Sequence, residues 1–169
     1  MSKDLHAVFN QVIKVFSRKP EMAKSVYSIK SRLVENLKTE SRAGSHTLVI
    51  DEPQELGGTD AGPNPLDTFL VALGTCQEIT YAAYAAVMGL KLDKVEVDVE
   101  GDIDLRGMLS IDDVKPGFSG ISYVTRITSP EPEEKIRQLV TAVEEHCPVM
   151  DTIKSPTMVA GRLEIQQSS

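Results

Sequence analysis

Hydrophobic residues are most densely grouped between positions 62 and 89, and their pattern predicts a single long helix there. Asn64 is a favourable N-cap residue, and Pro65 suits the first helical position because no backbone N–H is needed there. The stretch that follows is apolar around most of its circumference, which is typical of a helix buried on most of its sides. We therefore predict a central helix with Cys76 near its midpoint.

The chain before this helix changes from a helical to a strand-like pattern. Residues 3–18 repeat apolar side chains at helical spacing and end shortly before a proline, which predicts an amphipathic first helix. Residues 25–34 and 46–51 alternate polar and apolar positions as half-buried strands do, and the polar stretch 36–45 between them predicts a long turn. Residues 52–63 hold three glycines and two prolines, which predict an irregular loop leading into the central helix.

A second pair of strands and another helix are predicted after the central helix. Residues 94–105 and 118–128 both alternate apolar and polar positions. Two prolines precede a helix that starts at about Glu133, with acidic residues in the first turn, where they favour the helix dipole. Residues 157–165 have strand propensity and are predicted to close the chain. The predicted order is therefore a helix, two strands, the central helix, two strands, a helix and a strand.

Length and charge narrow the class of protein. A chain of 169 residues most often makes one domain, large enough to bury about two thirds of the surface that its unfolded form exposes. The net charge is −7 and the basic residues are scattered, so the footprint of a nucleic-acid binder is missing. The longest apolar run falls short of the roughly 20 residues that span a bilayer. Two cysteines without an apolar leader predict a cytoplasmic protein with free thiols.

The two cysteines are the main candidates for chemistry. Free cysteine is often a small buried hydrophobe, so a purely structural role for Cys76 and Cys147 stays open on residue type alone. Both interrupt or end an apolar helical run, and two helices packed on one core could bring them together. Cys76 lies too deep in its helix for the helix dipole to activate it, so a nucleophilic thiolate requires a cation from elsewhere. Arg42, in the predicted turn, is the first candidate, and a solvated turn arginine is the ordinary alternative.

A metal site is not expected. Three histidines and two cysteines could in principle supply four ligands, but His6, His46 and His146 lack the short paired spacing of a zinc site. The sequence therefore predicts no metal cofactor.

Three stretches of the chain resemble a known family. They are the loop DEPQELGGTDAGPNP at 51–65, the central segment GPNPLDTFLVALGTC at 62–76, and HCPV at 146–149. Together they closely resemble the OsmC family, the osmotically inducible and organic-hydroperoxide-resistance proteins. The likeness runs from about Tyr27 to Ile165. Residues 1–24 are accordingly predicted to form an N-terminal amphipathic helical extension, and residues 25–169 an OsmC-like domain.

This resemblance implies a fold, an assembly and an activity. OsmC proteins are intertwined α+β homodimers in which two long central helices lie between antiparallel sheets, with the active sites at the dimer interface. The well-studied members are thiol peroxidases that need no metal, flavin or haem. By the resemblance, Cys76 matches the peroxidatic cysteine and Cys147 the resolving cysteine. Arg42 is the best match for the family arginine that orients the thiolate, and Arg32 is the other candidate.

The family glutamate that holds this arginine has no direct match in the chain. In the organic-hydroperoxide branch the glutamate follows the Asn-Pro pair directly, where this chain has Leu66. Other branches place an acid one position later, where this chain has Asp67, which is one methylene shorter. Asp67 also fits an ordinary place in the first turn of a helix, so both interpretations of this residue stay open.

The sequence thus predicts a cytoplasmic thiol-dependent peroxidase of oxidative stress defence that reduces organic hydroperoxides through Cys76 and Cys147. The expected partners are a second copy of the chain and an external dithiol or lipoyl-type reductant, and no nucleic acid, membrane or bound cofactor is expected. A second hypothesis is a non-catalytic OsmC-fold protein that binds a small apolar ligand at the dimer interface. Leu66, in place of the family glutamate, is the feature that favours this second hypothesis.

Overall fold

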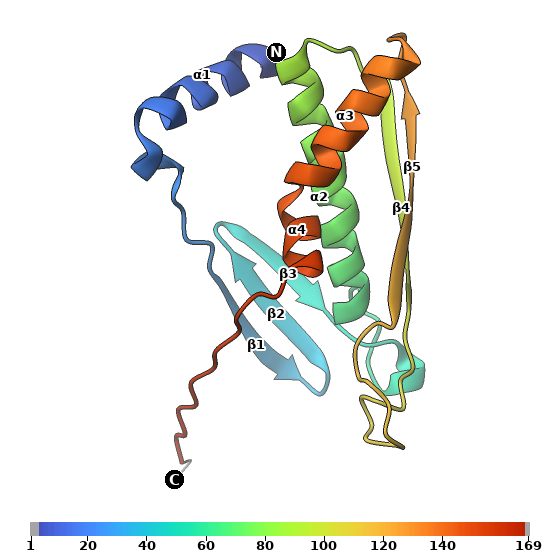
Figure 1. Ribbon diagram of the computed structural model, residues 1–169. Coiled ribbons are helices and arrows are strands. Elements are labelled where there is room, and N and C mark those ends of the chain that lie inside the picture. Colours follow the sequence, from blue (N-terminus) through green and yellow to red (C-terminus); the bar gives the residue numbers. More distant parts are fainter. Residues whose placement is uncertain (1–3, 168–169) are drawn as a thin grey trace.

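The computed structural model describes residues 4–167 and shows a mixed α+β architecture (Figure 1). Its helices and strands, in chain order, are α1 (Leu5–Arg18), β1 (Ile29–Glu35), β2 (Lys38–Ala43), β3 (His46–Ile50), α2 (Pro65–Met88), β4 (Lys94–Asp102), β5 (Gly120–Thr128), α3 (Glu133–His146) and α4 (Pro148–Lys154). Two short 3₁₀ turns, η1 (Pro20–Ala23) and η2 (Gln54–Leu56), lie in the connections. Among the described residues, no helix combines the length and the apolar character that crossing a membrane requires. The predicted α+β class is confirmed.

Helix α2 is the centre of the fold, as predicted (Figure 1). The Asn64 side chain caps its first turn by accepting a hydrogen bond from the Asp67 N–H at 2.8 Å. Gly89 ends the helix in the left-handed conformation, with φ at 67°, which glycine adopts without steric cost. These two caps set the ends of the helix where the sequence pattern predicts them.

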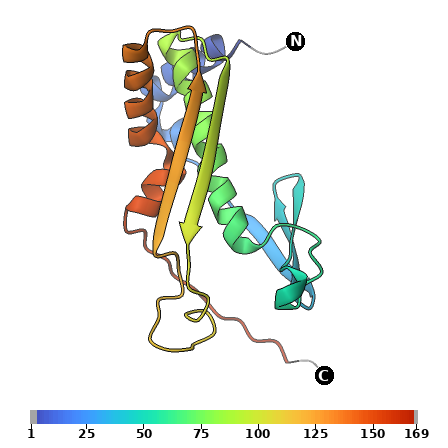
Figure 2. The ribbon, with the colours of Figure 1, turned by 90° about the vertical axis from the view of Figure 1, so that its right-hand side faces the viewer.

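An antiparallel ribbon of β4 and β5 lies along α2 (Figure 2). Side chains alternate between half-buried and exposed along both strands, as in a ribbon with one solvent face. Gly74 of α2 allows a close approach, because a Cβ atom there would lie 3.3 Å from Cγ2 of Val99. The long connection between the two strands turns back beside the N-terminal end of α2.

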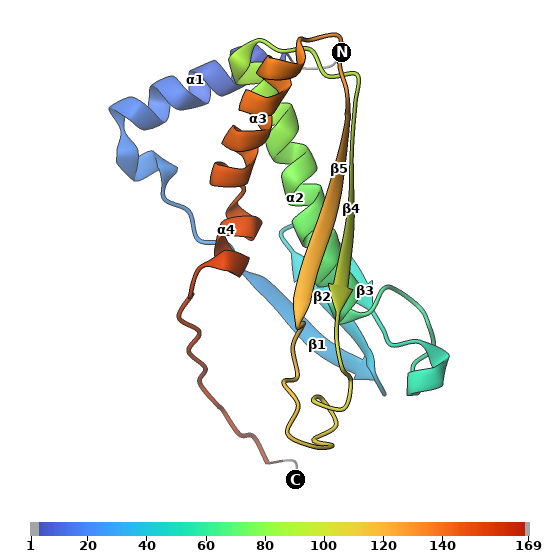
Figure 3. The same ribbon diagram turned by 45° about the vertical axis from the view of Figure 1, so that its right-hand side comes forward.

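Helix α3 packs beside α2 on the same face of the ribbon (Figure 3). Leu139 and Val143 of α3 are fully buried in one cluster with Tyr81 and Ala85 of α2. Full burial of a large apolar side chain contributes roughly 1.5–3 kcal/mol to stability. This cluster therefore fixes the C-terminal part of the chain to the central helix.

Strands β1, β2 and β3 form a separate antiparallel sheet that stands away from the middle of α2 (Figure 2). The predicted long turn at 36–45 is wrong, because β2 occupies most of it and is the central strand of this sheet. Its polar side chains find partners across the sheet: Ser41 donates to the Ser31 hydroxyl at 2.9 Å, and Arg32 forms an ion pair with Glu40 at 2.6 Å. A strand that is polar on both faces lacks the alternation that identifies strands.

Three other parts of the chain differ from the prediction. The first strand begins at Ile29 rather than at position 25, and residues 148–154 form α4, which the sequence pattern did not predict. The predicted strand at 157–165 is not observed: these residues run as an exposed coil, with Met158 93% exposed (Figure 1). A strand needs a neighbour for its backbone hydrogen bonds, and the described part of a single chain places none beside this segment.

Helix α1 forms as predicted and lies across the C-terminal end of α2 (Figure 3). His6 donates through Nδ1 to the Ala86 carbonyl of α2 at 2.6 Å. None of the residues of α1 is buried, and Leu5, Ile13 and Phe16 of its apolar stripe remain 40–46% exposed. In a single chain, α1 is therefore attached to the domain mainly through its first turns.

One side of α2 is also uncovered in the single chain. Val71 and Ile79 are 56% and 69% exposed, whereas the sequence pattern predicts a helix buried on most sides. The residues of α2 that are buried face the ribbon and α3. The central helix thus carries more apolar surface than one chain covers.

Asp51 fixes the loop between β3 and α2. Its carboxylate is 1% exposed and accepts hydrogen bonds from the N–H groups of Glu52, Thr59 and Ala61 and from the Thr59 hydroxyl, at 2.6–3.2 Å. The Thr59 hydroxyl contributes most, and together these donors lower the pKa of Asp51 to about 2. The buried Asp51 carboxylate therefore ties the start of the loop, at Glu52, to Thr59 and Ala61 near its end.

We expect Asp51→Asn to lower the melting temperature by several degrees at neutral pH, because an amide cannot accept all four hydrogen bonds. Folding lowers the pKa of this carboxyl from 3.8 to about 2. Its stabilising contribution is therefore present above the ordinary pKa and is lost as the pH falls through this window. Thermal unfolding from neutral pH down to the window tests this, and the difference from wild type should shrink toward low pH. Asp60→Asn, an exposed position in the same loop, is the control, and an equal loss there would contradict the assignment.

Candidate functional site

Cys76 lies on the side of α2 that meets the joint between α3 and α4. It is half-buried, and it packs against a cluster formed by Leu73, Cys147 and Met150. Phe69 and Leu73 precede it at helical spacing, so the same stripe of α2 is apolar on the N-terminal side of the thiol. The fold therefore presents Cys76 to a largely apolar surrounding.

Cys147 occupies the joint itself. Its N–H donates to the Val143 carbonyl at the end of α3, and its carbonyl accepts from the Asp151 N–H at the start of α4, both at 2.9 Å. Pro148 follows at the first position of α4, where proline is tolerated, and it cannot continue α3. The Cys147 side chain is 1% exposed.

Burial is the largest cause that raises the pKa of the Cys147 thiol above its ordinary value. The neighbouring Cys76 side chain raises this pKa further, whereas the backbone N–H groups of Met150 and Val149 act in the opposite direction. Cys147 is therefore held as a neutral thiol at neutral pH. The structure thus brings the two cysteines singled out in the sequence into one packed cluster.

Arg42 is not brought to these thiols within one chain. It lies in β2, opposite Lys30 and Thr47, with an exposed side chain, and not in a turn as the sequence pattern suggests. Arg32, the other candidate, is exposed on β1 and pairs with Glu40. Both arginines belong to the sheet that stands away from α2 (Figure 2).

Leu66 and Asp67 lie in the first turn of α2, where they line a cavity of about 400 Å³. Leu66 is half-buried and apolar, so the position of the family glutamate offers no charge. The Asp67 side chain is exposed, and its backbone N–H is the donor that Asn64 caps. The remaining walls of the cavity are mainly apolar and include Leu56, Leu70, Ile103, Leu105, Met108, Pro116 and Phe118.

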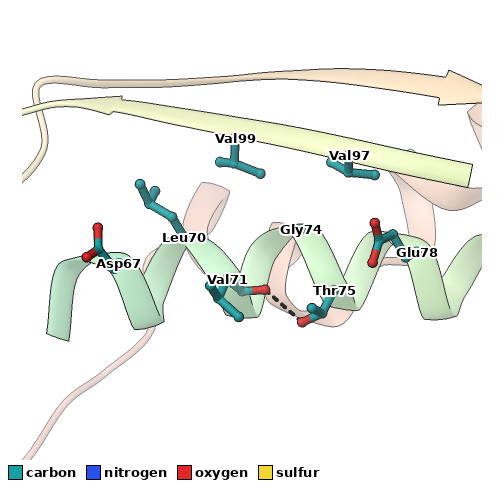
Figure 4. Close-up of a pocket in the computed structure, with 8 residues that line it drawn as sticks. All are labelled: Asp67, Leu70, Val71, Gly74, Thr75, Glu78, Val97 and Val99. Atoms are coloured by element: carbon teal, nitrogen blue, oxygen red, sulfur yellow. Dashed lines mark hydrogen bonds between the residues drawn. The ribbon is translucent and has the colours of Figure 1, made fainter. Parts of the chain in front are cut away.

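A second, open groove of about 430 Å³ runs between α2 and β4 (Figure 4). Asp67 and Glu78 lie toward its two ends, and Val97 and Val99 of β4 face the helix between them. At about 100° per residue, the α2 side chains of this groove lie on the side of the helix opposite to Cys76, so the groove is separate from the thiol cluster. Across residues 4–167, no group of three or more His, Cys, Asp or Glu side chains is arranged to hold a metal ion.

Two residues near the thiols were not singled out in the sequence. Tyr123 of β5 packs against the cluster that contains Cys147, and its hydroxyl donates to Oε1 of Glu144 at 3.2 Å. The alternation of β5 places Tyr123 on the helix-facing side, and Glu144 lies three residues before Cys147. Both signals are present in the sequence, but neither residue stands out until α3 is placed against the ribbon.

The fold and the site together define a class of protein. Its members are α+β chains with a long capped helix, an antiparallel ribbon along that helix and a pair of neighbouring thiols. Residues 58–160 match a family model described as OsmC-like protein. The chain belongs to this family.

Individual relatives agree with the family assignment. A hydroperoxide reductase from Mycoplasma genitalium is 28% identical over 95 residues, which cover 54% of this chain and 62% of that relative. The match therefore spans less than two thirds of the relative's length. A solved OsmC-like protein from Mycoplasma pneumoniae superimposes with a TM-score of 0.68 at 23% identity, over 78% of this chain and 89% of that chain. An organic hydroperoxide resistance protein OsmC from Legionella pneumophila gives 0.58 at 24% identity, over 77% and 90%.

Proposed function

We propose that the protein is a thiol-dependent peroxidase that reduces organic hydroperoxides, with Cys76 as the peroxidatic and Cys147 as the resolving cysteine. The observation that carries this proposal is the contact of a half-buried thiol on α2 with a buried thiol at the α3–α4 joint. Two thiols so placed can exchange between a dithiol and a disulfide. The names of the relatives, hydroperoxide reductase and organic hydroperoxide resistance protein, support the same chemistry.

The proposed cycle balances with the hydroperoxide as the only oxidant. The Cys76 thiolate attacks the terminal peroxide oxygen, the O–O bond breaks, and an alcohol leaves after it takes a proton. Cys76 is then a sulfenic acid. The sulfur of Cys147 attacks it, forms the disulfide and releases water, and an external dithiol or lipoyl-type reductant restores the two thiols. None of these steps needs a bound metal, flavin or haem.

The proposal includes a second copy of the chain. One side of α2 is uncovered, and the β1–β3 sheet stands away from it. In the proposed dimer, the central helix of the second copy packs on this side of α2, in an apolar interface typical of obligate homodimers. In such a dimer, Arg42 of the partner subunit is the cation proposed to stabilise the Cys76 thiolate. Asp67, at the N-terminal end of α2, is the proposed acid that orients this arginine.

The surroundings of Cys76 favour an organic substrate over hydrogen peroxide. Phe69 precedes Cys76 by two turns on the same stripe of α2 and is 41% exposed, and its ring stacks on Phe118 with the ring centroids 6.0 Å apart. An alkyl group gains from leaving water for such a surface, by about 25 cal/mol for each Å² of apolar area.

Counting free thiols tests the proposal. The reduced protein is titrated under denaturing conditions before and shortly after one equivalent of an organic hydroperoxide is added. We expect both thiols to disappear within seconds, whereas the same treatment leaves an exposed thiol on a control protein largely reduced. The alternative, a non-catalytic protein that binds an apolar ligand, predicts that both thiols remain.

A further inference from the structure

The buried position of Cys147 raises the question of where its proton goes. In the proposed cycle this thiol must lose a proton when its sulfur attacks Cys76. Its side chain is 1% exposed, so bulk water does not reach it directly, and burial disfavours the thiolate. The groups beside Cys147 therefore determine where this proton goes first.

Several titratable groups lie on the elements packed around Cys147. They are Cys76 and Tyr81 on α2, Tyr123 on β5, Glu144 and His146 on α3, and Asp151 on α4. The imidazole of His146 donates to the Ala142 carbonyl at 2.8 Å, and its ring lies against Tyr84, so it is directed away from the thiol pair. Asp151 is exposed and accepts from the Ser155 hydroxyl at 3.3 Å. Neither therefore forms a path from Cys147.

Tyr123 and Glu144 form a hydrogen-bonded pair beside the Cys147 cluster. Tyr123 is half-buried and packs against the Cys147 cluster, and its hydroxyl donates to Glu144 at 3.2 Å. Glu144 lies on the exposed side of α3, three residues before Cys147. The phenol thus packs against the cluster that holds the buried thiol, and it is bonded to an exposed glutamate.

The surroundings of Tyr123 and Glu144 determine which of the two groups holds the transferred proton. Burial raises the pKa of Tyr123, and the neighbouring Glu144 raises it further. The phenol therefore stays protonated at neutral pH and cannot itself remain as the base. It can accept one proton while it donates its own, and the carboxylate of Glu144 is the group that takes up the proton.

We propose that Tyr123 and Glu144 form the exit route for the proton of Cys147 during disulfide formation, an inference that rests on the resolving step of the proposed function. As the Cys147 sulfur attacks Cys76, the thiol proton passes to the Tyr123 oxygen and the phenol proton passes to Glu144. The hydroxyl of the Cys76 sulfenic acid leaves and takes a proton from solvent to form water. Glu144 then releases its proton to solvent, so that one sulfenic acid and one thiol become one disulfide and one water.

The test uses 2,2′-dithiodipyridine in place of peroxide, so that it does not depend on the peroxidase activity. The reagent converts Cys76 to a mixed disulfide and releases one thiopyridone, and Cys147 then displaces the second thiopyridone as the intramolecular disulfide forms. The second release should slow by about tenfold or more in Tyr123→Phe and Glu144→Gln at neutral pH. The first release should stay within about twofold of wild type, because the proposal assigns neither residue to Cys76.

The pH profile separates a proton route from a packing effect. Without the route, Cys147 is deprotonated by hydroxide. The rate of the second thiopyridone release in both variants should then rise by about tenfold for each pH unit, more steeply than in wild type. Tyr123→Phe keeps the ring and its packing, and Glu145→Gln, an exposed neighbour on α3, is the matched control that should behave as wild type. A second release at the wild-type rate in both variants would overturn the route. If the second release slows as expected while hydroperoxide leaves the thiols intact, the route stands and the peroxidase proposal fails.

Discussion

Cys76→Ser is expected to abolish hydroperoxide consumption, by about three orders of magnitude or more, while Cys147→Ser should reduce one equivalent and then stop. The reason lies in their different positions: Cys76 is the half-buried thiol that a substrate can reach, and Cys147 is sealed in the α3–α4 joint. Without Cys147, the sulfenic acid on Cys76 has no partner and advances to more oxidised species.

Mass spectrometry after stoichiometric hydroperoxide distinguishes the two variants. In Cys147→Ser, Cys76 should gain one oxygen, which a sulfenic-acid reagent traps, whereas Cys76→Ser should stay at the mass of the reduced chain. Serine is nearly isosteric with cysteine, so thermal unfolding should show both variants folded. Oxidation of Cys76 no faster than that of an exposed thiol on a control protein would contradict the peroxidase assignment.

Arg42→Ala is expected to slow oxidation of Cys76 by about a hundredfold, the cost of removing one preorganised charge from a site where negative charge develops. Arg32→Ala should matter less, because Arg32 is already paired with Glu40 on the surface. Stopped-flow measurement of hydroperoxide consumption by the two variants compares the two arginines directly. A larger effect from Arg32→Ala would assign the activating charge to Arg32 instead.

Mixed dimers show whether Arg42 acts across the interface. Cys76→Ser and Arg42→Ala chains, each inactive alone, are coexpressed with different tags. If Arg42 of the partner subunit serves Cys76, half of the randomly assorted dimers contain one intact site, and the mixture should regain about a quarter of the wild-type activity. No recovery in isolated mixed dimers would place both residues in one chain, and a monomer that retains activity would remove the shared site altogether.

The parts of the fold that could be predicted are those whose signals are local. The apolar stretch and the N-cap of α2, and the alternation along β4 and β5, are properties of short segments, and the structure places them as predicted. Strand β2 was missed because its residues are polar on both faces and their partners come from β1 and β3. The segment 157–165 was wrongly predicted as a strand because propensity does not supply a neighbouring strand.

The candidate site divides in the same way. The two cysteines stand out in the sequence, but their contact depends on how the α3–α4 joint packs against α2. Tyr123 and Glu144 meet only when α3 packs beside α2 on the ribbon. The role of Arg42 stays a prediction, because in a single chain this residue lies on a sheet apart from the thiols.

The distance along the chain between the two thiols gives the proposed cycle a mechanical consequence. A bond between Cys76 and Cys147 closes a covalent ring that contains β4, β5 and the whole of α3. In the chain-entropy account, a cross-link across 70 or so residues restricts the unfolded chain by about 4 kcal/mol at 25 °C. Each turnover would then alternate the subunit between a form that resists unfolding and degradation and one that is less protected. Peroxide exposure itself would make the oxidised subunit the more durable one until reductant arrives.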